Sequence, residues 1–132
     1  GYGHYANENG LEYIMYAWTP VEGYSKFGSY VGNGSSNGPF IYTGFRPAFV
    51  LWKRTTGGSN SWMIMDNKRE GYNPQNDLLF PDSSTNESDV TDQDLLSNGF
   101  KLRTSAAGRN SNTDTYIYAA FAESPFKHAN AR

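Results

Sequence analysis

Residues 44–54 read Gly-Phe-Arg-Pro-Ala-Phe-Val-Leu-Trp-Lys-Arg, and this stretch decides the expected fold. Apolar side chains fall on both alternating faces, with Phe49 and Leu51 on one face and Val50 and Trp52 on the other. A strand covered on one face alternates apolar with polar residues, whereas this pattern is typical of a strand covered on both. We expect the strand to begin just after the proline, because proline has no N–H to donate to a central ladder.

A second apolar run follows at residues 61–66, which read Ser-Trp-Met-Ile-Met-Asp. Residues 55–60 lie between the two runs and read Thr-Thr-Gly-Gly-Ser-Asn, a composition that favours a turn. The two runs therefore predict a β-hairpin at the centre of an all-β domain.

The composition excludes several classes of protein. The chain has 132 residues, enough for one domain with its own core, and a net charge of −2 that disfavours nucleic-acid binding. No apolar run is long enough to span a membrane, so we expect no membrane insertion. Aromatic residues make up 16 % of the chain and cysteine is absent, which favours sheets and excludes disulfides and thiolate metal sites.

Further strand signals appear along the rest of the chain. A Ser-Asn-Gly turn at residues 97–99 predicts a second hairpin, and residues 67–94 are polar enough to predict a long loop. The other strands are expected over residues 11–18, 27–31, 39–43 and 115–122. Together these signals predict an all-β fold, an antiparallel β-sandwich that is jelly-roll-like, with eight or nine strands and long loops.

The two ends of the chain resemble each other. Residues 12–18 and 115–121 are both Tyr-Ile-containing aromatic strands, and each is followed by a proline and a lysine-containing segment. This echo suggests that residues 1–21 form a strand and connector at the end of a preceding repeat. Residues 22–132 would then form the sandwich domain.

Several motifs resemble, in the same order, a domain that recurs near the C-termini of bacteriophage tail-fibre and related virion proteins. The resemblance covers residues 22–132, and its motifs lie at residues 22–34, 40–50, 97–103 and 116–127. It implies a non-enzymatic virion protein, extracellular in the phage tail or fibre, acting as a distal module that recognises a host cell-surface glycan or other receptor. It also implies self-association as a homotrimer or larger assembly.

Three other functions are consistent with the same residues. The chain could be a purely structural virion or fibre-assembly protein, a free-standing carbohydrate-binding module, or a glycan-cleaving enzyme. Strands that are apolar on both faces fit a subunit contact, and they equally fit a two-sheet sandwich in a single chain. Tyr24 and Tyr30 fit either role.

No catalytic site is expected. The two histidines, His4 and His128, both lie near a terminus, where packed neighbours would not hold a catalytic base. The carboxylates that could cleave a glycosidic bond have the spacing of solvated loop residues: Asp66, Glu70, Asp77 and Asp82.

No metal site or cofactor is expected either. Asp89, Asp92 and Asp94 are close in sequence, but they lack the spacing and the glycine of a calcium-binding loop. Residues 32–38 are glycine-rich and lack the Lys-Ser/Thr of a phosphate-binding loop, so they predict a turn.

Aromatic residues in polar surroundings are the remaining candidates for ligand binding. Tyr72 lies in the long polar loop, where core packing explains an aromatic residue poorly, whereas Trp52 and Trp62 are expected in the core. Glycan sites combine an aromatic face with amide and guanidinium groups, which predicts a ligand-binding cluster of Arg69, Tyr72, Asn73 and Asn76. Packing within the loop is the alternative explanation of this cluster.

Overall fold

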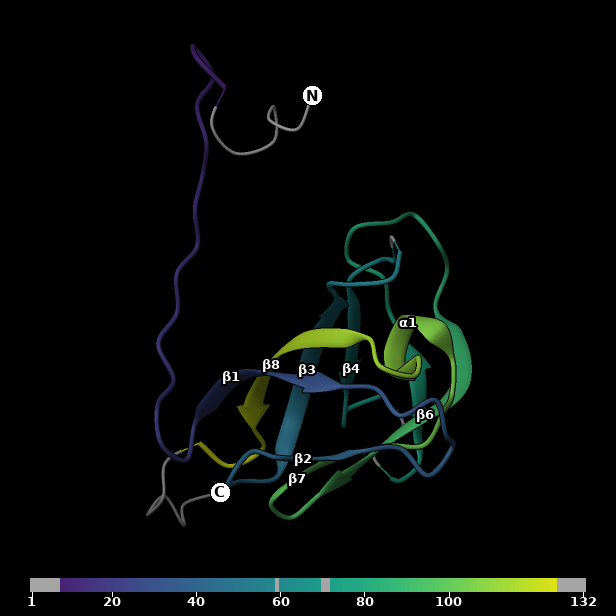
Figure 1. Cartoon of the computed structure of the whole chain (residues 1–132). Coiled ribbons are helices and arrows are strands. Elements are labelled where there is room, and N and C mark those ends of the chain that lie inside the picture. Colours follow the sequence, from purple (N-terminus) through teal and green to yellow (C-terminus); the bar gives the residue numbers. More distant parts are fainter. Residues whose placement is uncertain (1–7, 59, 70–71, 126–132) are drawn as a thin grey trace.

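The computed structural model describes residues 8–58, 60–69 and 72–125, which form two antiparallel four-stranded sheets packed face to face (Figure 1). The first sheet has the strand order β1-β8-β3-β4 and the second has the order β2-β7-β6-β5. The first sheet comprises β1 (Ser25–Val31), β8 (Thr115–Ala122), β3 (Pro47–Arg54) and β4 (Met63–Asp66). The second comprises β2 (Phe40–Tyr42), β7 (Gly99–Leu102), β6 (Ser88–Leu96) and β5 (Gln75–Leu78). The expected all-β sandwich is confirmed.

The pairing of the outermost strands is nested, while the inner strands pair as hairpins, β3 with β4 and β5 with β6. The first strand pairs with the last, β1 with β8, and the second pairs with the seventh, β2 with β7, in the opposite sheet. A one-turn helix, α1 (Ala107–Asn110), lies in the connection between β7 and β8. Long-range pairing of the two ends of the chain therefore encloses the shorter hairpins.

Both predicted hairpins are present. In β3–β4, Leu51 lies opposite Ile64 and Trp52 lies opposite Met63, with β3 between β4 and β8. In β6–β7, Leu96 lies opposite Gly99 across the predicted turn. The hairpins form where turn residues separate two apolar runs, because neighbouring runs can pair with little loop-closure entropy.

The core lies between the inner faces of the two sheets. Trp52 is 2 % exposed, which confirms its expected place, and Tyr30 is buried there too. The expectation for Trp62 is wrong: it is only partly buried and lies on the outward side of the first sheet. The Tyr30 ring stacks on that of Tyr116, with centroids 4.9 Å apart and an interplanar angle of 8°. The other buried apolar residues are Ile41, Val50, Met63, Met65, Leu78, Leu95, Phe100, Leu102, Tyr118 and Ala120.

The prediction of a long polar loop over residues 67–94 is wrong. This segment contains β5 and most of β6, which pair with each other. Gln75 and Gln93 are opposite each other and are each 1 % exposed. Because polar side chains occupy these interior positions, the sequence lacks the apolar alternation by which a strand is recognised. Tertiary pairing outweighs local composition here, because strand preference depends strongly on context.

The strand predicted over residues 11–18 does not form. The structure places no strand between residues 8 and 20, and the described chain provides no neighbouring strand for them. An apolar pattern alone does not make a strand, because its backbone N–H and C=O groups need a partner strand. Within the described residues, no helix has the length and apolar character to cross a membrane.

Candidate functional site

The outward side of the first sheet carries a cluster of apolar residues beside charged and polar ones. We call this side the outer apolar face, and it is partly exposed over three strands and the start of a fourth. Its members are Phe27, Phe49, Leu51, Trp62, Ile117, Ala119 and Phe121. These members are uncharged, but Lys53 and Asp66 lie on the same side, opposite Ile117 and Phe49, and the Lys53 ammonium is 5.9 Å from the centre of the Trp62 ring. Most residues on the solvent side of a sandwich are polar, so this face is unusual for a sheet that meets only water.

Aromatic rings organise one half of the outer apolar face. The Phe121 ring lies 5.9 Å from the Phe27 ring and 5.9 Å from the Phe49 ring, both in edge-to-face geometry. Trp18, which precedes the first strand, stacks on Phe27 at 6.4 Å. Edge-to-face pairs favour such rings by about 0.5–1.5 kcal/mol each beyond the area that they bury. The cluster therefore has a defined shape even where it is partly exposed.

The outer apolar face is hollowed. One hollow of about 320 Å³ has Trp18, Phe27, Trp62 and Ile117 among its walls. A second hollow, of about 210 Å³, shares Trp18 and Phe27 and continues towards Phe121. Both are lined almost entirely by apolar atoms, so they match an apolar side chain better than a polar ligand.

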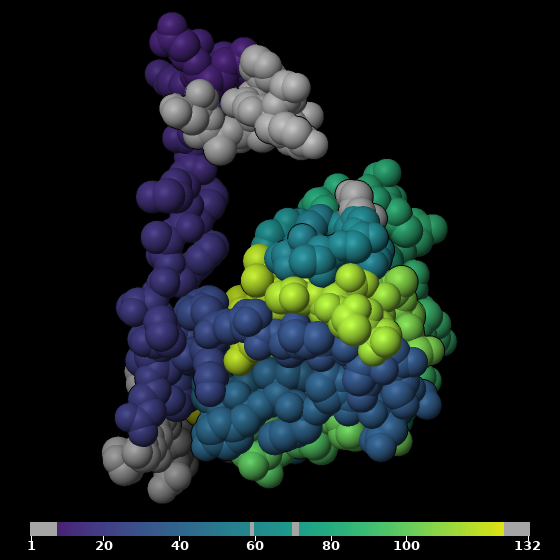
Figure 2. Space-filling model, in the orientation of Figure 1, coloured from purple at the N-terminus to yellow at the C-terminus, as the bar shows by residue number. Residues whose placement is uncertain are grey.

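An extended N-terminal segment projects from the sandwich beside this face. We call residues 11–18 the arm; it stands away from the sandwich in Figure 1, and in Figure 2 open space separates its N-terminal part from the sandwich. Ile14 is 83 % exposed, Met15 86 % and Tyr16 73 %. Trp18, at the C-terminal end of the arm, contacts the face through Phe27. The arm is therefore a row of large apolar side chains anchored at one end.

Most residues of the predicted ligand-binding cluster make hydrogen bonds or ion pairs within the fold. Arg69 makes ion pairs with Asp66, at 2.9 Å, and with Glu87. Burial opposes the charge of Arg69, but its hydrogen bonds to Glu87 and Asp66 raise its pKa above the usual value. Asn76 donates a hydrogen bond to Asp89 at 2.7 Å across the β5–β6 pair. Both side chains are occupied by internal partners.

Asn73 and Tyr72 differ sharply although they are adjacent. The Asn73 amide exchanges two hydrogen bonds of 2.9 Å with the backbone of Leu95 in β6. Tyr72 is 65 % exposed, and its carbonyl accepts a hydrogen bond of 2.6 Å from Gln75. Both residues are exposed, but the Asn73 side chain is hydrogen-bonded to β6, whereas Tyr72 is free to present its ring to solvent.

The carboxylates considered for catalysis have different partners. Asp82 accepts hydrogen bonds from the Trp62 N–H at 3.0 and 3.1 Å. Burial alone would raise the pKa of Asp66, but hydrogen bonds from Lys68 and Arg69 lower it. His4, Glu70 and His128 lie outside the described residues. No three His, Asp or Glu side chains of the described chain gather into a potential metal site.

A buried ion pair was not anticipated from the sequence. Asp92 is 1 % exposed, and its carboxylate lies 2.8 Å from the Arg109 guanidinium. Burial raises the pKa of Asp92 to about 7, although Arg109 opposes the shift. The Tyr30 hydroxyl donates to the Arg109 carbonyl at 2.9 Å. Both residues lie in polar, turn-like sequence, so no local signal could have found the pair.

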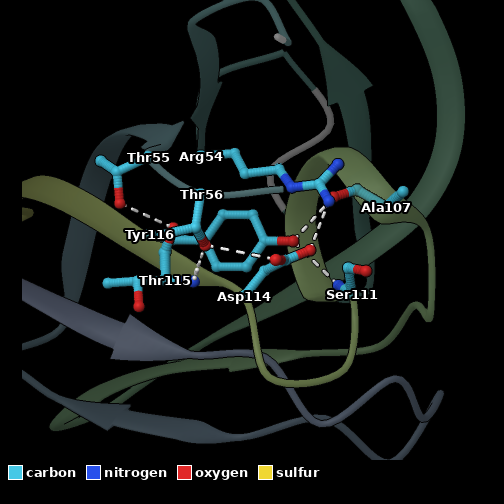
Figure 3. A network of polar contacts seen from close by, with 8 residues as sticks. All are labelled: Arg54, Thr55, Thr56, Ala107, Ser111, Asp114, Thr115 and Tyr116. Carbon is cyan, nitrogen blue, oxygen red and sulfur yellow. Dashed lines mark hydrogen bonds and ion pairs between the residues drawn. The ribbon is translucent and has the colours of Figure 1, made fainter. Parts of the chain in front are cut away.

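A polar network connects the end of β3 to the start of β8 (Figure 3). Arg54 forms an ion pair with Asp114, and the Thr56 hydroxyl donates to the same carboxylate at 3.2 Å. The Thr115 N–H donates to the Thr56 hydroxyl at 2.8 Å. A hydrogen bond from Ser111 and the charge of Arg54 lower the pKa of Asp114. These contacts hold the loop after β3 against the loop before β8.

A mixed cleft of about 330 Å³ lies between the turn before β1 and the end of β2. Lys26 and Tyr42 lie along it, with the Lys26 ammonium 5.0 Å from the centre of the Tyr42 ring. The cation–π contact covers part of the ring that a sugar would need.

Comparison with known proteins matches residues 1–125 to a family described as a domain of unknown function (DUF7483). The chain belongs to this family. No curated protein and no solved structure matches it. The DUF7483 match includes the arm as well as the sandwich. The arm is therefore part of the domain as the family defines it, although most of its side chains face solvent in a single copy.

Proposed function

We propose that this DUF7483 domain is a non-enzymatic structural module of a phage tail fibre or related virion assembly, and that it packs against a neighbouring protein subunit through the outer apolar face. The observation that carries the proposal is the hollowed apolar face formed by three paired strands and Trp62. The virion setting rests on the resemblance of residues 22–132 to tail-fibre domains.

Energetics support a protein contact on this face. Burying apolar surface contributes about 25 cal/mol per Å², and monomeric proteins rarely leave a contiguous apolar patch larger than a few hundred Å². The face combines large apolar side chains with two charged ones, Lys53 and Asp66, which lie opposite Ile117 and Phe49. Protein interfaces likewise combine apolar and aromatic anchors with a smaller number of charged residues.

The polar side chains support a role without chemistry. The ion pairs Asp92–Arg109, Arg54–Asp114 and Arg69–Glu87 each join distant segments of the fold. A catalytic base or nucleophile needs a free position facing a cleft, together with a partner that orients it. The acidic groups of these pairs are instead committed to structural cations.

Recognition of a host-surface glycan is the second candidate function, and Tyr72 is the observation that favours it. Its ring is 65 % exposed, while the neighbouring Asn73 fixes the backbone to β6. A rigidly placed aromatic face suits stacking on a sugar ring. Arg69 and Asn76 would contribute only by exchanging their internal partners.

The solution mass tests the assembly proposal. We expect light scattering to give a multiple of the 14.7 kDa chain, and the Ile117→Lys variant to return towards that single-chain mass. Ile117 is 41 % exposed at the hollow, so a lysine is tolerated in the single copy but is unpaired in an interface. The expected loss of affinity is at least about 100-fold.

The matched control is Tyr42→Ser, which removes an aromatic residue with 58 % exposure from the second sheet. It should leave the mass of the assembly unchanged. A wild-type chain that stays at 14.7 kDa at all concentrations would contradict the proposal. So would an assembly that keeps its mass with Ile117→Lys.

A further inference from the structure

We propose that the occupant of the outer apolar face is the arm of a second copy of this chain. Residues 11–18 of one copy would lie across the face of another, with Ile14 and Tyr16 in the two hollows beside Trp18. This inference rests on the proposed function, because it names the partner for the same face.

The arm has the composition of a segment that is buried in its functional state. Side chains alternate along an extended chain, so Ile14, Tyr16 and Trp18 project to one side while Met15 projects to the other. Tyr16 and Trp18 stack at 6.1 Å, which gives that side a continuous aromatic surface. A linker exposed to solvent is ordinarily rich in small and polar residues. This segment is not.

The arm and the face are chemically complementary. The hollows are lined almost entirely by apolar atoms, and Glu12 is the single charged residue among positions 11–18. Contact through Ile14 and Tyr16 therefore buries no charge that would need a partner.

The path of the chain favours a second copy over the same copy. The turn before β1 is closed by a two-way backbone pairing of Val21 with Ser25, which brings Trp18 to the β1 edge of the face. Beyond Trp18 the arm runs away from the sandwich (Figures 1 and 2). Ile14 consequently lies in solvent, and Tyr16 contacts Trp18 of the arm and is otherwise mainly exposed, while the hollow beside Trp18 stays open.

The area is sufficient for a stable complex. Large side chains carry roughly 150–250 Å² each, so Ile14, Tyr16 and part of Trp18 bury on the order of 400 Å² per arm. Two exchanged arms and the two faces that they cover then account for about 1,600 Å² in total. This is the usual size of a specific protein–protein interface.

Site-directed cross-linking tests the exchange directly. The chain contains no cysteine, so single Ile14→Cys and Ile117→Cys variants each carry one thiol. The two variants, given tags of different mass, are mixed and treated with oxidised glutathione. We expect a disulfide-linked heterodimer at a yield at least about fivefold above that of Ile14→Cys mixed with the exposed control Tyr42→Cys. Equal yields would overturn the proposal.

The double variant Ile14→Cys/Ile117→Cys separates exchange from folding back within one copy. If the arm lies on another copy, oxidation produces covalent multimers on a non-reducing gel. If the arm lies on its own face, oxidation produces a monomer with an internal disulfide, and the exchange is disproved.

Light scattering of arm variants gives an independent readout. Because the arm lies outside the sandwich, substitutions in it should not unfold the domain, so a lower mass reports weaker association. The Ile14→Ser/Tyr16→Ser variant should weaken association by about 100-fold. Met15→Ser, on the opposite side of the arm, should weaken it by less than about threefold. If Ile117→Lys dissociates the assembly but the arm variants do not, the exchange is refuted and the proposed function is left intact. A wild-type monomer would refute both.

Discussion

The two sides of the first sheet carry similar side chains and have different surroundings. On β3, Val50 and Trp52 point inward and are 0 % and 2 % exposed, whereas Phe49 and Leu51 point outward and are partly exposed. The backbone and the chemistry are shared by all four residues. Only the inward pair meets a second sheet, because β2, β7, β6 and β5 cover one side alone.

This difference teaches that an apolar face and a covered face are separate properties. Alternate residues of one strand can supply two apolar faces, while a sandwich of two layers has one interior. Burial of the interior has already contributed its hydrophobic free energy to folding, whereas burial of the uncovered face would still release such free energy. It is available for a contact with another chain.

The largest expected effect contrasts the two sides within one strand. Trp52→Ala should destabilise the fold by about 3–5 kcal/mol, because it removes a buried ring and leaves a cavity between the sheets. Leu51→Ala, one residue away, should cost about 1 kcal/mol or less in dilute protein, since its side chain already meets solvent. Urea unfolding followed by tryptophan fluorescence or circular dichroism measures both. Equal losses would mean that the outer apolar face is covered within a single copy.

A second prediction concerns the charge inside the sandwich. The folded pKa of Asp92 is about 7, and the unfolded pKa is about 3.9. The folded state therefore holds this proton more tightly, so the associated stability is complete below about pH 4 and is lost as the pH rises to about 7. A difference of about 3 pH units at 1.36 kcal/mol each amounts to about 4 kcal/mol at most.

Urea unfolding between pH 4 and pH 8 checks this slope, and Asp92→Asn is the control. The variant loses the titrating group, so its free energy of unfolding should vary less over that range, whatever its absolute stability. A slope that is identical in the two proteins would show that Asp92 is ionised in the folded state throughout.

The smallest expected effect separates the two halves of the predicted ligand cluster. Asn73→Ala should cost about 1–3 kcal/mol, because it leaves backbone groups of Leu95 without their partners. Tyr72→Ala should change stability by less than about 0.5 kcal/mol, since the ring lies mainly in solvent. Thermal unfolding compares the two variants. Glycan-array binding that Tyr72→Ala abolishes would support the receptor role, and unchanged binding would contradict a role for this ring.

Most strands were predictable because their signals are local. The run from Ala48 to Trp52, the turn around Asn98 and the aromatic run of β8 combine apolar pattern with turn chemistry. β5 was missed because Gln75 is buried as part of a strand with a polar sequence. The same limit applied to Asp92, whose partner Arg109 comes from the α1 turn, which packs beside it only after folding.

The candidate site was predicted in part. The possibility that one apolar face contacts a neighbour followed from the double-sided pattern of the strands. The hollow beside Trp18 and Trp62 could not be predicted, since it depends on how side chains from five parts of the chain meet. The predicted cluster around Tyr72 combined residues by sequence proximity, and the fold gave Arg69, Asn73 and Asn76 internal partners.

By itself, the sequence determined the all-β class, most of the strands, both hairpins and the presence of two apolar faces on β3 and β8. These features depend on alternation and turn residues, which act between near neighbours in the chain. Only the tertiary structure decided which face became the interior, that the arm stands clear of the sandwich, and that Asp92 meets Arg109. Those outcomes depend on contacts between distant segments, because burial and pairing are properties of the assembled layers.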